Sequence, residues 1–308
     1  MSAIPLPDPA ARGALAAAAK PPAARLAAAA VPLLALIAVI YSGLAKGLWT
    51  TWTTNDNYSH GPLVPLVAAV LVWSRRRRLA ALSVRGSWLG LPVIAAACAM
   101  QIAGLRSDVF TLQGWSLPLL LFGLVLALLG RGWARALAFP TAFLCFMLTF
   151  PPVIVNQLSF ALKEVTVRFA TRASEALGVA LIRDGMTLHL SDGELRIENP
   201  CSGLRSLLAL LATGALFAAL QPGRLWRRTV LFLAAMPVAM AANALRITAL
   251  ILVGHYVGVQ EAGGLAHDAS GYVLYVIALL GLLGVRHLLT PRAPAPGPVP
   301  TALESMGR

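Results

Sequence analysis

Three side chains with the chemistry of acyl transfer stand at separate places where polar sequence meets apolar sequence. Cys201 lies in the stretch Glu198-Asn-Pro-Cys-Ser-Gly203, Arg246 lies in a later apolar run, and His267 precedes the last run. A cysteine thiolate is a nucleophile, an arginine stabilises a developing oxyanion, and a histidine relays protons near neutral pH. The combination predicts a cysteine enzyme within the membrane rather than a carrier.

Cys201 lies at the expected start of a membrane helix that begins near Gly203. A thiol there feels the positive end of the helix dipole and unpaired backbone N–H groups, which lower its pKa and favour the thiolate. Arg205, one turn along, would add positive charge if it faces the same way. Glu198 would raise the thiol pKa, so we expect it to pair with Arg196 or Arg205, and its role in the site stays open. The alternative interpretation is a structural cysteine at a helix cap.

Arg246 and His267 also have two interpretations each. Asn243 and Arg246 are three residues apart and share a helix face. An arginine inside a membrane helix costs roughly 2.5–3.5 kcal/mol on insertion scales, so it usually faces a partner or a wet cavity; the alternative is an arginine that reaches the outer headgroups. His267 precedes the last expected helix, where Asp268 would orient its ring for proton transfer; the alternative is that Asp268 or Ser270 simply caps that helix.

Other candidate groups are weaker. Tyr58 and His60, in Tyr-Ser-His-Gly61, lie on the expected outer face and could line a substrate entrance. A metal site would need histidine, cysteine or carboxylate ligands at close spacing, and the sequence has no such cluster and no phosphate-binding loop. We therefore predict neither a metal nor a cofactor.

The composition is that of a polytopic membrane protein. Of 308 residues, 58% are hydrophobic and only 12% are charged, with a mean hydropathy of +0.75. Soluble proteins are about 25% charged. The net charge of +13 arises from Lys and Arg in the expected cytoplasmic loops, which set orientation and meet anionic headgroups, so we do not expect nucleic acid as a partner. Three cysteines are too few for a disulfide framework, and Cys98 and Cys145 fall inside apolar runs, as core residues do.

The apolar runs predict an all-α integral membrane protein with about eight transmembrane helices, since about 20 residues cross a bilayer. They fall near residues 26–45, 61–74, 87–105, 113–130, 136–155, 203–221, 229–253 and 270–289. Residues 1–25 would form a disordered cytoplasmic tail, 26–290 the membrane catalytic domain, and 291–308 a Pro-rich cytoplasmic tail. Both termini would then be cytoplasmic, with the three reactive side chains on the outer face.

A polar outer insert, residues 156–200, separates the fifth and sixth expected helices. Within it, residues 158–180 have the apolar spacing of an amphipathic helix on the membrane surface. Residues 186–190 and 194–198 alternate like the strands of a β-hairpin, with a turn at Asp192-Gly193. The hairpin would lead the chain to Cys201.

Taken together, the motifs resemble the exosortase/archaeosortase family of membrane transpeptidases. The matching elements are Glu198-x-x-Cys201-x-Gly203, Asn243-x-x-Arg246, His267-x-x-x-Gly271 and, earlier, Tyr58-Ser-His60-Gly61. The resemblance covers about residues 40–290. It implies Cys201 as the nucleophile that forms a thioester, Arg246 as transition-state stabiliser and His267 as general base and acid.

The resemblance also implies the substrate. Family members cleave secreted proteins that carry a short C-terminal motif, often Pro-Glu-Pro, then a membrane helix and a basic cluster. An acceptor nucleophile, for which a lipid and a polysaccharide are the alternatives, resolves the thioester. Two alternatives stay open: a simple intramembrane cysteine protease, and a non-enzymatic subunit for exopolysaccharide or lipid transport or assembly.

Overall fold

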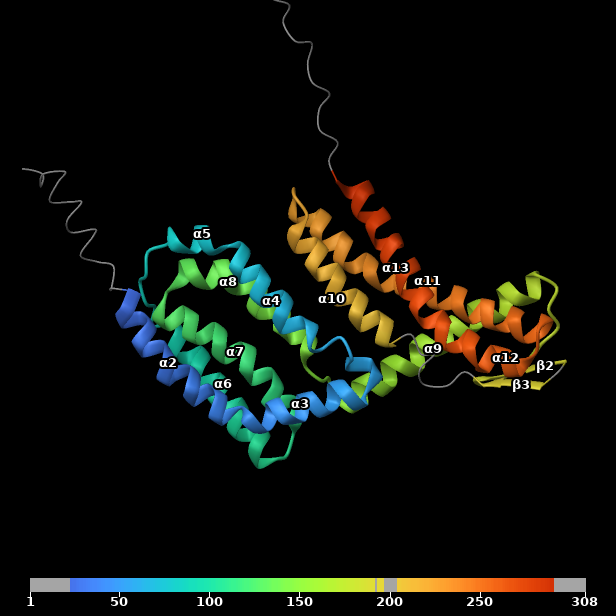
Figure 1. Ribbon diagram of the computed structural model, residues 1–308, viewed down its shortest axis with the longest axis horizontal. Coiled ribbons are helices and arrows are strands. Elements are labelled where there is room, and N and C mark those ends of the chain that lie inside the picture. The colour runs from blue at the N-terminus through green and yellow to red at the C-terminus, as the bar shows by residue number, and fades with distance from the viewer. Residues whose placement is uncertain (1–22, 192, 197–203, 291–308) are drawn as a thin grey trace, which may run out of the picture. The chain divides into compact units, whose positions relative to one another are not determined.

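Runs of alanine, leucine and valine form helices along most of the computed structural model, which describes residues 23–191, 193–196 and 204–290 (Figure 1). The chain divides into two compact units, Met1–Leu158 and Ser159–Arg308. The tails expected at 1–25 and 291–308 lie almost entirely outside the described residues. The division into a membrane domain between two tails therefore stays a prediction.

The first unit is helical in all its described residues that have regular structure. Its elements are α2 (Ala23–Ile40), α3 (Ser42–Thr54), η1 (Asp56–Tyr58), α4 (Leu63–Ser74), α5 (Arg76–Ala80), α6 (Gly90–Arg106), α7 (Phe110–Leu128), α8 (Arg131–Phe143), η2 (Leu144–Met147) and the start of α9 (Pro152–Ala176). The helices α6 and α7 form its most extensive pair.

Glycines allow α6 and α7 to approach closely. A Cβ atom added to Gly90 would overlap the backbone of Ala127, and one added to Gly123 would lie 2.9 Å from a side-chain carbon of Ile94. Small residues serve this purpose in membrane helix pairs because lipid supplies no hydrophobic driving force between helices. A buried polar chain adds to the packing: the Tyr41 hydroxyl bonds the Ser116 hydroxyl at 2.8 Å.

The second unit combines helices with a small sheet. Its elements are the rest of α9, β1 (Ile182–Asp184), β2 (Thr187–Leu190), β3 (Gly193–Arg196), α10 (Leu204–Leu220), α11 (Leu225–Tyr256), α12 (Val259–Gly263) and α13 (Leu265–Leu289). The helix α11 packs against both α10 and α13. The sheet contacts α12 through β3, and its Leu188 and Leu195 share a buried core with Val167 of α9 and Ile247 of α11.

The outer insert differs from the sequence-based expectation in two respects. Its helix, α9, begins at Pro152 rather than near 158, because Leu148 is extended and the pair Pro151-Pro152 starts a new helix, a position where proline costs no hydrogen bond. The sheet has three antiparallel strands in the order β1-β2-β3, so β1 was not anticipated. Residues 197–198, the end of the expected hairpin, lie outside the described residues.

Three helices in the described part of the chain are long and apolar enough to cross a membrane: Phe110–Leu128, Leu225–Tyr256 and Ser270–Leu289. The number rises to five if each of two bent helix pairs counts as one span; α2 and α3, which bend by 61°, form one of them. The helices α6 and α10 have 17 residues each and α4 has 12, which corresponds to about 25 Å and about 18 Å of length. Because hydrocarbon is about 30 Å thick, the expected eight spans are not confirmed.

Candidate active site

Arg246 is held on α11 by a hydrogen bond to the neighbouring helix α13. Its guanidinium Nε donates to the Ser270 hydroxyl at 2.8 Å, and the side chain is half-buried. Asn243, one turn earlier on the same helix, is only 2% exposed. The arginine is thus directed toward α13, as expected for a charged group that faces a partner rather than lipid.

Gly271 lies beside the same guanidinium. A Cβ atom added to Gly271 would stand 4.0 Å from Arg246 Nη2. The α11 motif Asn243-x-x-Arg246 and the α13 motif that ends at Gly271 therefore meet across this helix pair. Sequence reasoning treated Ser270 only as a possible helix cap and missed its bond to Arg246; its position three residues after His267 was the available signal.

His267 lies within α13, three residues before Ser270. The sequence-based expectation placed it just before the last helix, but α13 begins at Leu265, and its N-cap is Gly264 rather than Asp268. The alternative role of Asp268 as the cap of this helix is therefore wrong. The side chains of His267 and Asp268 lie outside the described part of the structure.

The cysteine motif precedes α10, as its place in the sequence requires. Residues 197–203, which include Glu198, Cys201 and Gly203, lie outside the described residues, and α10 begins at Leu204. Arg205 is exposed in the first turn of α10. The proposed pairing of Glu198 and the proximity of Cys201 to a helix N-terminus both stay predictions.

Tyr58 and His60 join two loops of the first unit. The Tyr58 hydroxyl accepts a hydrogen bond from the Phe150 backbone N–H at 3.1 Å, and His60 Nε2 lies 3.1 Å from the Phe146 carbonyl oxygen, to which it can donate. Tyr58 is 4% exposed, and burial raises the pKa of its phenol. Both side chains position the segment between α3 and α4, and their contact with a substrate stays a prediction.

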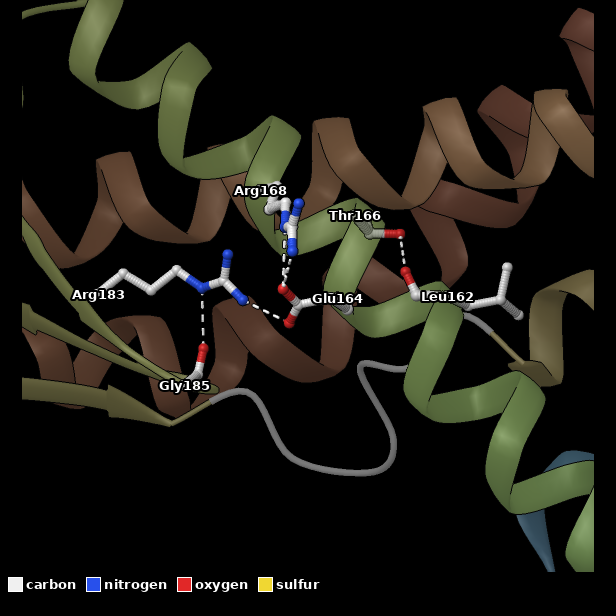
Figure 2. A network of polar contacts seen from close by, with 6 residues as sticks. All are labelled: Leu162, Glu164, Thr166, Arg168, Arg183 and Gly185. Atoms are coloured by element: carbon white, nitrogen blue, oxygen red, sulfur yellow. Dashed lines mark hydrogen bonds and ion pairs between the residues drawn. The ribbon is translucent and has the colours of Figure 1, made fainter.

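A polar network on α9, drawn in Figure 2, was not anticipated as a functional feature. The Glu164 carboxylate accepts from Arg168 Nε at 2.9 Å and from Arg183 Nη2 at 2.5 Å, so one carboxylate holds two guanidinium groups. The part of α9 from residue 159 onward carries five charged side chains, which favour water or lipid headgroups over hydrocarbon. The hydrogen bond from Arg168, supported by the charge of Arg183, holds the pKa of Glu164 below its ordinary value.

Two cysteines, Cys98 and Cys145, lie among the described residues. Cys98 is exposed on α6, so its assignment to the core is wrong, because the apolar run there has one face turned outward; Cys145 is half-buried in η2. Within residues 23–191, 193–196 and 204–290, no group of three or more His, Cys, Asp or Glu side chains is arranged to hold a metal ion.

The fold and site define a helical membrane protein in which a hydrogen bond from Arg246 to Ser270 joins two of the long apolar helices, α11 and α13. Residues 52–284 match the family model described as transmembrane exosortase (Exosortase_EpsH). Since the match covers well over half of the 308 residues, the chain belongs to the transmembrane exosortase family. No curated protein and no solved structure matches the chain.

Proposed function

We propose that the chain is a membrane-embedded cysteine transpeptidase that cleaves the C-terminal sorting signal of secreted proteins and transfers them to an acceptor. Family membership supports an exosortase-type function in a membrane. The observation that carries the proposal further is the bond from Arg246 to Ser270 beside Gly271, which joins the α11 motif to the α13 motif. A half-buried guanidinium in that position suits the stabilisation of an oxyanion.

The proposed reaction has two steps. The Cys201 sulfur attacks the scissile carbonyl carbon while its proton passes to His267, and Arg246 stabilises the negative charge on the oxygen. The C–N bond then breaks, and His267 returns the proton to the leaving amine, which leaves a thioester on Cys201. An acceptor nucleophile attacks the thioester carbon, and the thiol is released.

The membrane supplies orientation in this proposal. A substrate anchored by its own helix presents the scissile bond at a fixed depth, which removes much of the entropic cost of bringing the reactants together. The site faces the periplasmic or outer side of a bacterial inner membrane, and both termini are cytoplasmic. The basic cluster of the substrate then remains in the cytoplasm, in agreement with the distribution of positive charge.

The test is co-expression with a secreted reporter that carries a Pro-Glu-Pro motif, a membrane helix and a basic cluster. The processed reporter is compared for wild type, Cys201→Ala and Cys201→Ser, and mass spectrometry identifies its new C-terminus. We expect both variants to abolish processing, because neither alanine nor serine at this position can form the thioester. The matched control is Cys98→Ala, which removes a thiol from the exposed surface of α6.

Two outcomes separate the alternatives. A mass added to the cleaved end indicates transfer to an acceptor, and a free carboxylate indicates hydrolysis by a simple protease. Normal processing by a folded Cys201→Ala protein would sink the thioester mechanism. If the chain is a non-enzymatic transport subunit, processing of the reporter does not depend on the Cys201 thiol.

A further inference from the structure

A polar hollow of about 520 Å³ opens beside α9 and the β1 strand in the second unit. Its size falls within the range of roughly 300–1,000 Å³ typical of small-ligand sites. Six side chains line it and bear on its chemistry: Arg168, Arg172, Arg183, Glu164, Glu175 and Thr171. Three guanidinium groups face two carboxylates there, which leaves one net positive charge.

The arginines are arranged before any ligand arrives. Glu164 fixes Arg168 and Arg183 from one side, and Arg183 Nε also donates to the Gly185 carbonyl oxygen at 2.9 Å (Figure 2). Arg172 differs from them, since within the described residues it makes no ion pair or hydrogen bond. A guanidinium group in a fixed orientation, such as that of Arg168 or Arg183, is well placed to bind a phosphate group, because two phosphate oxygens can accept parallel N–H bonds from one arginine.

Thr171 supplies an independent sign that a partner is missing. The side chain is 8% exposed and lines the hollow, yet its hydroxyl has no hydrogen-bond partner among the residues that the structure describes. Thr166, buried on the same helix, donates to the Leu162 carbonyl oxygen at 2.6 Å (Figure 2). Because buried hydroxyl groups are normally satisfied, the Thr171 hydroxyl is available to a ligand in the hollow.

The surface next to the hollow indicates whether the ligand comes from the membrane or from solution. Val165 and Phe169 are exposed on α9, and their helical positions adjoin those of Arg168 and Arg172. Apolar side chains beside arginines are the pattern of a helix that lies in the membrane interface, with its apolar groups at the acyl boundary and its cations at the phosphates. This arrangement favours a lipid over a soluble ligand.

We propose that the hollow formed by Arg168, Arg172, Arg183 and Thr171 binds the phosphate group of an anionic membrane lipid. In this site Arg172 and the Thr171 hydroxyl donate to the phosphate oxygens, and Phe169 lies among the acyl chains. The proposal does not depend on the cysteine chemistry proposed above. Lipid binding and reporter processing are separate measurements, so either can fail without the other.

The test is native mass spectrometry of the full-length protein in detergent micelles with added phosphatidylglycerol or phosphatidylcholine. We expect selective retention of phosphatidylglycerol, weakened about tenfold in Arg172→Gln by the loss of one charge-assisted contact. Thr171→Val, which keeps the shape but removes the hydroxyl, should weaken retention by a smaller factor. Glu175→Gln should strengthen it, because it removes a negative charge from the lining.

Two controls match these variants on the same helix. Lys163→Gln removes one positive charge and Ser174→Ala removes a buried hydroxyl group, and neither residue lines the hollow. Both should retain phosphatidylglycerol as wild type does. The thermal unfolding of every variant shows whether it is folded.

The proposal is overturned if folded Arg172→Gln and Thr171→Val retain phosphatidylglycerol as well as wild type does. Equal retention of phosphatidylcholine overturns the preference for an anionic lipid. Inorganic phosphate distinguishes the source of the phosphate group. Displacement of the lipid by inorganic phosphate as effectively as by phosphatidylglycerol itself overturns the lipid as ligand in favour of the free anion.

Discussion

Removal of the Ser270 hydroxyl is the sharpest test of how Arg246 acts. In wild type the Arg246 Nε on α11 donates to Ser270 Oγ on α13 at 2.8 Å. A hydrogen bond to a charged group contributes about 1.5–3 kcal/mol. Because Arg246 is only half-buried, water replaces part of this energy, so we take the lower end of the range.

The expected effect of Ser270→Ala is therefore about a tenfold loss in the rate of reporter processing, since 1.36 kcal/mol corresponds to a factor of ten. Arg246→Ala removes the oxyanion donor itself and should cost about 2.7–4 kcal/mol, or about 10²–10³-fold. Ser270 is a positioning residue in this reasoning, so Ser270→Thr, which restores a hydroxyl, should recover most of the rate.

The assay is the initial rate of reporter cleavage by purified protein in proteoliposomes. Tyr275→Phe is the matched control, because it removes another hydroxyl from α13 whose partner is Thr213, at 3.2 Å, rather than Arg246. A double-mutant cycle completes the test: in an Arg246→Ala background, Ser270→Ala should cost nothing further. The reasoning is refuted if the Ser270→Ala protein cleaves the reporter as fast as the Tyr275→Phe protein does. It is also refuted if Ser270→Ala lowers the cleavage rate by the same factor in the Arg246→Ala background as in wild type.

Two predictions concern stability. Glu164→Gln should lower the melting temperature at neutral pH, because the carboxylate joins two arginines. The folded-state pKa of Glu164 lies below its ordinary value of 4.5, so its stabilising effect is complete above about that pH and is lost as the pH falls through the folded pKa. A difference from Glu164→Gln that persists unchanged at lower pH would contradict this. Gly90→Ala should destabilise the first unit by about 1–3 kcal/mol through overlap with Ala127, whereas Gly43→Ala, which meets open space in α3, should not; equal melting temperatures for these two variants would exclude close packing of α6 on α7.

Much of the fold follows from local properties of the chain. Each expected apolar run contains helix in the described residues, because hydrophobic composition and helix propensity act within a few turns. Helix ends were less predictable. The start of α9 at Pro152 depends on the extended backbone before it, and the start of α13 at Leu265 joins a polar stretch to an apolar helix. The number of spans depends on helix length and bending, which composition alone does not set.

In the candidate site, too, some features could be predicted from the sequence and others depend on tertiary packing. The reactive residue types and their order could be recognised from the sequence, because Cys201, Arg246 and His267 each stand out against apolar surroundings. The role of Ser270 could not, since it lies 24 positions from Arg246 and only the packing of α11 on α13 brings the two together. The pairing of Glu164 with Arg183 likewise spans 19 positions and depends on the turn from α9 into β1.

The sequence by itself thus determined that this is a helical membrane protein of the exosortase type, because hydrophobicity, charge placement and motif order are properties of the chain. Only the tertiary structure decided which hydroxyl holds Arg246 and where three arginines gather beside a buried, unsatisfied threonine. The physical reason is that hydrogen bonds and ion pairs require side chains within about 3–4 Å. Distance between residues far apart in sequence is set by helix packing, and no local pattern encodes it.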